Sequence, residues 1–350
     1  MQSRSPSSPP CILIVPIYRN DSLDCRATVT RRMTQATHRL SLERIEQASE
    51  LIDPVFLNTP QFVCEPLCDE LGIRLALKIE TLNPIRSFKG RGADLLVARA
   101  TAEAPLICAS AGNFGQAMAY ACRKRGLPLT VYASKNANPL KVERMQALGA
   151  RVVRAGTDFD EAKLAARRAA VDLNARFVED SRDIETVEGA GTMGVEWTAF
   201  PEPLDALLVA LGNGAMLNGV ACVMKDRSPQ TRMIAVQAAG APAMIDSWRA
   251  GRSIAYDETR TIADGIAVRV PVPEALQDMR GMIDDAILVR DDTIIQAMRM
   301  LHRHAGLVAE PSAAVGIAAL LEHPRAFRDQ FVGTIVCGGN LTDAQIREWL

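Results

Sequence analysis

From Ser41 onward the sequence alternates short apolar runs with helical patterns, and this alternation limits the fold of the 350-residue chain more than any other feature. The run that follows Asp205 is apolar as far as Leu211, which is typical of a strand buried on both faces of a parallel sheet. Alternating strands and helices favour parallel sheets covered by helices, so we expect an α/β protein. The predicted strands are 75–79, 106–109, 129–133, 151–155, 176–178, 205–211, 233–236, 286–289 and 334–337.

Helix signals lie between these runs. The segment 41–52 has amphipathic spacing and begins with Ser41, a good helix cap. A second helix is predicted to start near Phe114. A third is predicted with Asn138 as its cap and Pro139 at its first position, where a missing N–H costs nothing.

The first 32 residues differ from the rest of the chain. They begin with the Ser/Pro-rich stretch Met1–Pro10 and continue without a helical or strand period of useful length. We expect residues 1–32 to form a poorly ordered extension. Met33 precedes the globular pattern and is therefore a candidate for the physiological start.

Composition excludes several classes of function. The net charge of -1 predicts no electrostatic footprint for nucleic acid or an anionic membrane. No run reaches the roughly 18 apolar residues that a bilayer span needs. The eight cysteines are irregularly spaced, which favours reduced thiols and a cytoplasmic protein. His302 and His304 would point to different faces of one helix, so we expect no histidine metal site.

Two glycine-containing turns follow predicted buried strands. They are Ser110–Gln116 and Gly212–Met216. Small residues let a ligand approach the backbone, and free N–H groups at a helix start bind anions. Each turn alone is equally compatible with a tight strand-to-helix connection. Neither has a dinucleotide or Walker pattern, so a single phosphate is favoured over a dinucleotide or ATP.

Two further blocks are candidates for chemistry. Taken alone, Lys89 among small and basic residues would be a solvated surface lysine. Arg86 and Arg91 are close in sequence and would favour its neutral, nucleophilic form. The block Cys337–Asn340 follows an apolar strand and would by itself be a structural turn.

Six blocks in order resemble those of the serine/threonine dehydratase family, whose members are fold type II enzymes that depend on pyridoxal 5'-phosphate (PLP). The resemblance runs from about Thr59 to Asn340. The blocks are the lysine signature 87–93, the Asn-containing loop 110–116, the counterpart 212–216 of a tetraglycine phosphate loop, and the segments 261–265, 310–316 and 337–340.

The resemblance implies a role for each matching residue. Lys89 would form the Schiff base with PLP and move the α-proton of the substrate. Phe88 and Gly265 would lie beside the cofactor ring, Asn113 would bond the ring hydroxyl, and Cys337 would face the pyridine nitrogen. The phosphate would be held by the backbone N–H groups of Gly212, Asn213, Gly214, Ala215 and Met216. The substrate carboxylate would be faced by Ser87, Ser110, Ala111 and Gly112.

The resemblance also implies the architecture and assembly. Fold type II enzymes have two domains, each with a mostly parallel sheet flanked by helices. Here the large PLP-binding domain would comprise 33–104 and 183–350, and the small domain 105–182. A homodimer is expected.

The implied reaction is removal of water and then ammonia from threonine or serine, which leaves a keto acid. A neutral thiol at Cys337 would not stabilise a long-lived carbanion, and this suits prompt β-elimination. Ala111 stands where the serine racemase branch has its second base. Gln237 and Ala243 replace that branch's acidic cation ligands, so no metal is expected. These departures favour a dehydratase over a racemase.

Other departures leave alternatives open. Asn213 and Ala215 interrupt the glycine loop, and Phe114 stands where many members have His. The regulatory domain of biosynthetic threonine dehydratases is not expected in this protein. A β-replacement, a racemisation or an elimination from another β-substituted amino acid therefore remains an alternative. A non-catalytic PLP-binding protein is a further one, which the presence of Lys89 disfavours.

Overall fold

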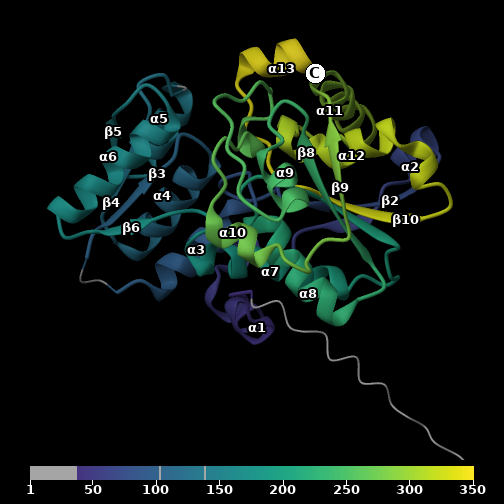
Figure 1. Cartoon of the computed structure of the whole chain (residues 1–350), viewed down its shortest axis with the longest axis horizontal. Coiled ribbons are helices and arrows are strands. Elements are labelled where there is room, and N and C mark those ends of the chain that lie inside the picture. Colours follow the sequence, from purple (N-terminus) through teal and green to yellow (C-terminus); the bar gives the residue numbers. More distant parts are fainter. Residues whose placement is uncertain (1–37, 102–103, 138) are drawn as a thin grey trace, which may run out of the picture. The chain divides into compact units, whose positions relative to one another are not determined.

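The structure is a computed structural model that describes residues 38–101, 104–137 and 139–350 (Figure 1). The predicted extension 1–32, the candidate start at Met33 and the predicted cap Asn138 lie outside the described residues. The described residues belong to one compact unit of the chain.

Strands and helices alternate along the chain as the apolar pattern predicts. The strands are β1 (Gln61–Val63), β2 (Arg74–Ile79), β3 (Leu106–Ala109), β4 (Leu129–Ala133), β5 (Arg151–Arg154), β6 (Arg176–Val178), β7 (Ala206–Ala210), β8 (Arg232–Ala238), β9 (Asp285–Val289) and β10 (Phe331–Val336). The helices are α1 (Leu42–Leu51), α2 (Glu65–Leu71), α3 (Lys89–Arg99), α4 (Asn113–Arg125), α5 (Pro139–Ala147), α6 (Phe159–Asp172), α7 (Ile184–Thr198), α8 (Ala215–Arg227), α9 (Ala243–Ala250), α10 (Pro273–Asp278), α11 (Asp291–Ala305), α12 (Pro311–Glu322) and α13 (Asp343–Trp349), with short 3₁₀ turns η1 (Pro54–Phe56), η2 (Asp264–Ile266) and η3 (Pro324–Ala326).

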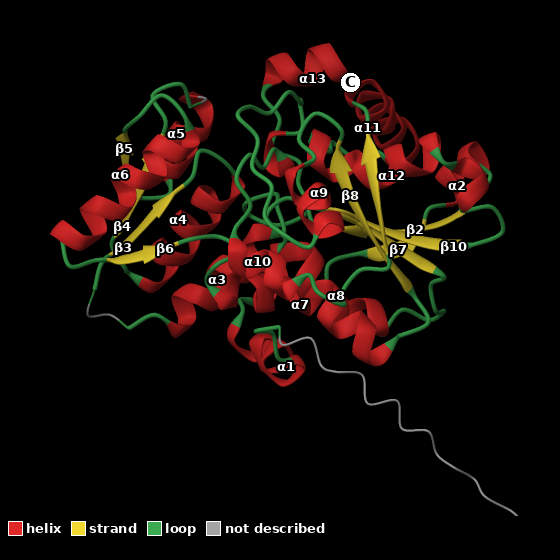
Figure 2. Ribbon diagram, in the orientation of Figure 1, coloured by secondary structure: helices red, strands yellow, loops and turns green. Residues whose placement is uncertain are grey.

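The strands form two sheets, which confirms the α/β class (Figure 2). The six-stranded sheet has the order β1-β2-β10-β7-β8-β9, and the four-stranded sheet has the order β5-β4-β3-β6. All pairs are parallel except β1 with β2. The sequence analysis did not predict β1.

Strand β10 begins at Phe331, earlier than the predicted 334. A glycine at position 333 hides the strand pattern, because glycine is a poor strand former. The structure shows why it is there. A Cβ on Gly333 would lie 2.5 Å from the Leu204 side chain, so a larger residue here would require its packed neighbours to shift.

The strand order brings distant segments of the chain together. Strand β3 pairs with β6, and β7 pairs with β10, in parallel. Parallel neighbours end at the same edge of a sheet, where ligands of open α/β proteins bind. The turn 110–113 therefore lies beside residues 179–180, and the turn 212–216 lies beside Cys337.

Helix α3, which begins at Lys89, packs closely against α7 because glycines lie at the contact. A Cβ on Gly92 would lie 2.5 Å from the backbone oxygen of Thr186, and one on Gly189 would lie 2.6 Å from Cα of Gly92. Such contacts require backbones to approach without side chains between them. The start of α3 is thus fixed by main-chain packing.

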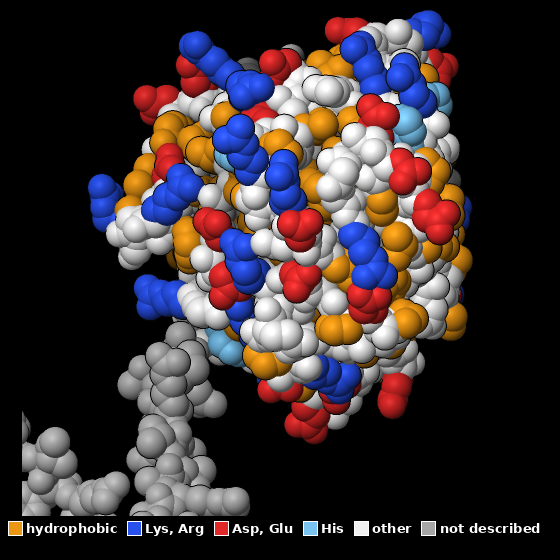
Figure 3. Space-filling model, turned by 90° about the vertical axis from the view of Figure 1, so that its right-hand side faces the viewer, with side chains coloured by type: hydrophobic (Ala, Val, Ile, Leu, Met, Phe, Trp, Pro, Cys, Tyr) orange, Lys and Arg blue, Asp and Glu red, His pale blue; other side chains and the backbone are white. Residues whose placement is uncertain are grey.

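The surface carries charges of both signs. On the face drawn in Figure 3, basic and acidic side chains of the described residues are interspersed. Among the residues that the structure describes, no helix combines the length and apolar character that crossing a bilayer requires.

Candidate active site

A cavity of about 600 Å³ lies where the carboxyl ends of strands from both sheets face each other. Its volume is in the range of small-molecule sites. The four-stranded sheet contributes the segments after β3 and β6, and the six-stranded sheet contributes those after β7 and β10. Further walls come from the start of α3, the turn η2 and the start of α12.

Nearly all the site residues predicted from the sequence line this cavity. Those that line it are Phe88, Lys89, Ser110, Ala111, Gly112, Asn113, Gly212, Asn213, Gly214, Ala215, Met216, Gly265 and Cys337. Ser87 is fully buried instead, and its hydroxyl accepts a hydrogen bond from the Lys89 backbone N–H at 3.4 Å. Ser87 therefore supports the backbone of Lys89. Its expected contact with a substrate stays a prediction.

Lys89 points its amine into the cavity. Nζ lies 2.7 Å from Oδ2 of Asp180 and 4.6 Å from the centre of the Phe88 ring. The amine therefore has an acidic partner that comes from the other sheet, at the end of β6. Sequence reasoning did not single out Asp180. The available signal was a pair of acidic residues, Glu179 and Asp180, after a predicted parallel strand.

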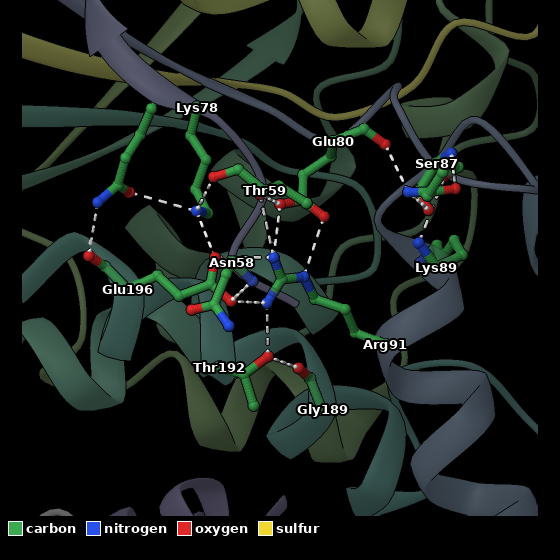
Figure 4. A network of polar contacts seen from close by, with 12 residues as sticks. Asn58, Thr59, Lys78, Glu80, Ser87, Lys89, Arg91, Gly189, Thr192 and Glu196 are labelled. Carbon is green, nitrogen blue, oxygen red and sulfur yellow. Dashed lines mark hydrogen bonds and ion pairs between the residues drawn. The ribbon is translucent and has the colours of Figure 1, made fainter. Parts of the chain in front are cut away.

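Arg91, which is close to Lys89 in sequence, belongs to a buried network of its own, and its expected effect on Lys89 stays a prediction. Its guanidinium is completely buried and donates to both carboxylate oxygens of Glu80, at 2.8 and 3.0 Å. It also donates to both oxygens of Glu196 in α7, at 2.6 and 2.9 Å. Figure 4 shows the side chain extending away from Lys89 into this network. Arg91 thus ties the first turn of α3 to β2 and α7.

Burial and pairing have opposite effects on the network's pKa values. Burial is the largest effect on Lys78 and lowers its pKa, although Nζ lies 2.5 Å from Oε2 of Glu196. For Glu196, burial opposes ionisation, but the hydrogen bond and charge of Arg91 leave its pKa lowered. Arg91 and Glu196 are therefore charged, and Arg91 belongs to α3, the helix that begins at Lys89.

Asn113 is held at both ends of its amide. Nδ2 donates to Oε1 of Glu310 at 2.8 Å, and Oδ1 accepts from Nδ2 of Asn340 at 2.9 Å. Asn340 in turn accepts from Arg144 of α5 at 3.1 Å. The amide plane is therefore fixed, and the second N–H of Asn113 is left to contact a ligand.

Glu310 is a buried carboxyl group in the cavity wall. Burial raises its pKa to about 7, and the charge of Asp264 adds to the shift. Its second oxygen accepts from the backbone N–H of Asn340 at 3.2 Å. The sequence marked the block 310–316 but assigned Glu310 no role. The signal was an acidic residue before an apolar helix that starts with proline.

Cys337 lies at the end of β10. Its backbone oxygen accepts from the Phe88 N–H at 3.0 Å, and a bridge pairs Ser87 with Gly338. These contacts hold the cysteine beside the segment that carries Lys89. Burial raises the pKa of the thiol, and the neighbouring Glu310 adds to the effect. Cys337 is therefore a neutral thiol near pH 7.

The turn 212–216 has the shape of an anion cradle. Gly214 has φ +95, a left-handed conformation that favours glycine, and it precedes α8. A Cβ on Gly212 would lie 3.0 Å from the backbone oxygen of Gly265. The first N–H groups of α8 have no partner within the helix and open onto the cavity.

Polar atoms without a partner support a ligand in this cavity. Asn213 Oδ1, Asp180 Oδ1 and Ser312 Oγ are buried, unpartnered and belong to residues that line it. Buried polar atoms normally have a hydrogen-bond partner. A lysine amine, a phosphate cradle and unsatisfied polar atoms together fit PLP.

Gln237 and Ala243, the two positions at which no cation ligand is expected, are both buried in the fold. Gln237 is buried in β8, and its Oε1 accepts from the Ile245 N–H at 3.1 Å. Ala243 is buried at the start of α9. Gln237 therefore fastens α9 to the large sheet, and the absence of a metal stays a prediction.

Comparison with known proteins agrees with this site. Residues 52–338 match the family model described as pyridoxal-phosphate dependent enzyme. The L-threonine ammonia-lyase of Thermotoga maritima is 32% identical over 305 residues, which cover 86% of this chain and 76% of that protein. The processed form of threonine deaminase isoform 2 from Solanum lycopersicum superimposes with a TM-score of 0.81 at 26% identity, covering 89% of this chain and 88% of that one. Maize serine racemase superimposes with a TM-score of 0.83 at 26% identity, covering 88% and 96%.

Proposed function

This chain belongs to the family of pyridoxal-phosphate dependent enzymes, and we propose that it is a threonine/serine ammonia-lyase that converts a hydroxy-amino acid to a 2-keto acid and ammonia. One observation carries the proposal: the Lys89 amine, the 212–216 anion cradle and the fixed Asn113 amide line the same cavity. The identity to L-threonine ammonia-lyase supports elimination as the reaction.

The residues that we propose for PLP are those that the family resemblance implies, and each of them lines the cavity. Lys89 would form the Schiff base, and the backbone of 212–216 would bind the phosphate. Asn113 would donate its second N–H to the ring hydroxyl, and Cys337 would face the pyridine nitrogen as a thiol. Phe88 and Gly265 would border the ring. When bound, PLP supplies an electron sink for bond cleavage at the substrate α-carbon.

The rest of the cavity would orient the substrate. The Ser110 hydroxyl oxygen accepts from the Gly115 N–H at 3.0 Å and the Gly112 N–H at 3.2 Å, so its own O–H can donate to a carboxylate. Ala111 and Gly112 leave space beside it, since nothing lies within 4 Å of a Cβ built on Gly112. The Lys89 amine would accept the α-proton.

Two observations favour elimination over the main alternatives. Racemisation needs a second proton donor, and the methyl group of Ala111 cannot donate. A neutral Cys337 does not hold a pyridine nitrogen protonated, which disfavours a long-lived carbanion. Replacement, or elimination from another β-substituted amino acid, remains the second candidate.

The test is turnover of a substrate panel by the PLP-loaded protein. We expect keto acid and ammonia from L-threonine or L-serine, and loss of both products and of the visible cofactor band in Lys89→Ala. Lys124→Ala is the control, because Lys124 pairs with Asp53 outside the cavity. Cofactor loading without release of keto acid from any β-hydroxy amino acid would refute an ammonia-lyase.

We also propose a large domain of 33–104 and 183–350 and a small domain of 105–182. Support comes from the four-stranded sheet, whose strands all lie between Leu106 and Val178. A homodimer and a cytoplasmic location are further proposals, which follow from the family and from cysteine usage. Sedimentation and cell fractionation test them.

A further inference from the structure

We propose that Asp180 is a catalytic residue that donates a proton to the departing β-hydroxyl group and receives that proton from Lys89. The inference rests on the proposed ammonia-lyase function and adds a residue to it. It begins from one contact, the 2.7 Å separation between Asp180 Oδ2 and Lys89 Nζ.

The two carboxylate oxygens of Asp180 have different surroundings. Oδ2 faces Lys89, whereas Oδ1 is buried without a partner, and the residue lines the cavity. A buried oxygen without a hydrogen-bond partner costs free energy, unless a ligand donates a hydrogen bond to it. A substrate hydroxyl group in the cavity would supply that missing partner.

The turn that carries Asp180 is strained and firmly held. Ser181 has φ +67, a left-handed conformation that is uncommon for a residue other than glycine. The Glu179 N–H donates to Asp183 at 2.7 Å, and the Ser181 N–H donates to Thr186 at 2.9 Å. Arg39 donates to the backbone oxygen of Arg182 at 2.6 Å. Strain maintained by so many contacts is typical of functional positions.

Three other acids that line the cavity have basic partners of their own. Glu179 is paired with Lys163 and Arg167, and Asp160 is paired with Arg269. Asp264 lies 2.6 Å from Lys141. Among the described carboxylates that line the cavity, Asp180 is the one recorded in an ion pair with Lys89.

The proton balance of elimination closes within this pair. The α C–H bond breaks, its proton goes to the Lys89 amine, and its electrons form the new Cα–Cβ double bond. The ammonium passes a proton to Asp180 across the 2.7 Å contact. The Cβ–O bond breaks with its electron pair on oxygen, which takes the proton from Asp180 and leaves as water. Both residues return to their starting states.

The leaving group provides the sharpest test. Chloride departs without a proton, whereas hydroxide needs one. Asp180→Asn should therefore lower kcat for L-serine or L-threonine by about 10²–10⁴-fold, the usual contribution of a positioned acid. The same variant should retain most of its activity on β-chloro-L-alanine. Asp180→Glu should partly restore elimination from serine.

Two readouts are independent of keto acid release. The first is exchange of the serine α-proton with D₂O, followed by NMR, which Asp180→Asn should retain because Lys89 is intact. The second is the PLP content of the variant, measured as the Lys89 peptide trapped by borohydride, which should equal that of the wild type. Asp172→Asn is the control, since Asp172 is exposed at the end of α6 and does not line the cavity.

The outcomes separate this inference from the proposed function. Equal losses with serine, β-chloro-L-alanine and α-proton exchange would make Asp180 a positioning residue for Lys89 and overturn the inference. Full activity on serine would do the same. If Asp180→Asn does not fold, Asp180→Ser provides a second variant without a carboxyl group. A wild type that binds PLP but eliminates water from no substrate would overturn the proposed function and the inference with it.

Discussion

Oε1 of Glu310 lies 2.8 Å from Nδ2 of Asn113, although 197 residues separate them in the chain. The contact places a buried carboxyl group against the amide proposed to bind the cofactor ring. Burial raises the pKa of Glu310 to about 7, so its charge changes near neutral pH. The protonation state of Glu310 therefore affects the stability of the cavity wall.

This link predicts a pH-dependent stability difference. The pKa of Glu310 is raised from 4.5 to about 7 in the folded protein, so its contribution is complete below 4.5 and is lost as pH rises through 7. Relative to the wild type, Glu310→Gln should gain on the order of 3 kcal/mol of unfolding free energy between pH 4.5 and 8. Urea unfolding of PLP-free protein at both pH values measures this.

The exposed variant Glu43→Gln is the matched control for Glu310→Gln. Loss of a hydrogen bond to Asn340 would shift the stability of Glu310→Gln at every pH, and this constant offset cancels in the comparison. A difference from the wild type that does not change with pH would contradict the assigned titration.

The conformation of Gly214 predicts weaker cofactor binding on substitution. Gly214→Ala introduces a side chain at φ +95, and its Cβ would lie 2.9 Å from Nδ2 of Asn218. That nitrogen cannot move freely, because it donates to the Ala275 backbone oxygen at 2.9 Å. We expect the turn to distort and the Kd for PLP to rise by about tenfold, equivalent to roughly 1.4 kcal/mol.

Titration of PLP-free protein with PLP measures that Kd. Gly251→Ala is the control, since Gly251 has φ +66 in open space at the end of α9. It should lower Tm without changing cofactor affinity. Equal Kd values for wild type and Gly214→Ala would place the phosphate elsewhere.

The buried pairing of Arg91 predicts a large loss of stability. Arg91→Met leaves Glu80 buried without its cationic partner, which should cost about 3–5 kcal/mol of unfolding free energy. Adding Glu80→Gln should recover part of the loss. Denaturant unfolding measures both variants, and Arg232→Met, which breaks a longer and exposed pair with Asp285, should have a much smaller effect.

Because Ala111 has no proton to donate, we expect turnover to produce little of the D-amino acid. The wild type should release keto acid from L-serine and form almost no D-serine. Ala111→Ser adds a hydroxyl group in the cavity wall and should raise D-serine formation, because a positioned donor contributes about 10²–10⁴ in rate. Chiral analysis after partial turnover measures it, with Ala111→Gly as the control without a donor. Comparable racemisation and elimination by the wild type would contradict a site with one base.

The residues at 237 and 243 predict insensitivity to chelators. Gln237 is engaged with the Ile245 N–H, and Ala243 has no ligand atom in its side chain, so neither offers the carboxylate that divalent cations prefer. Incubation with a chelator should leave keto acid production unchanged. A large loss that magnesium or calcium reverses would show that a cation site exists.

Local patterns were sufficient to predict most of the secondary structure, and the family resemblance named most of the residues that line the cavity. Strands β3, β4 and β6 have the predicted bounds, because a short apolar run between turn residues is read from neighbours in sequence. The turns after β3 and β7 could be placed near a ligand, because parallel strands have their binding edge at the carboxyl end. The resemblance then assigned roles to residues whose types the chemistry requires.

Only the tertiary structure decided which side chains meet. Arg91 is two positions from Lys89 in sequence but pairs with Glu80 and Glu196, because a helix turns successive side chains to different faces. Asp180 meets Lys89 because β6 pairs with β3, an arrangement that no local period encodes. The raised pKa of Glu310 is likewise a consequence of burial, which depends on every element packed around it.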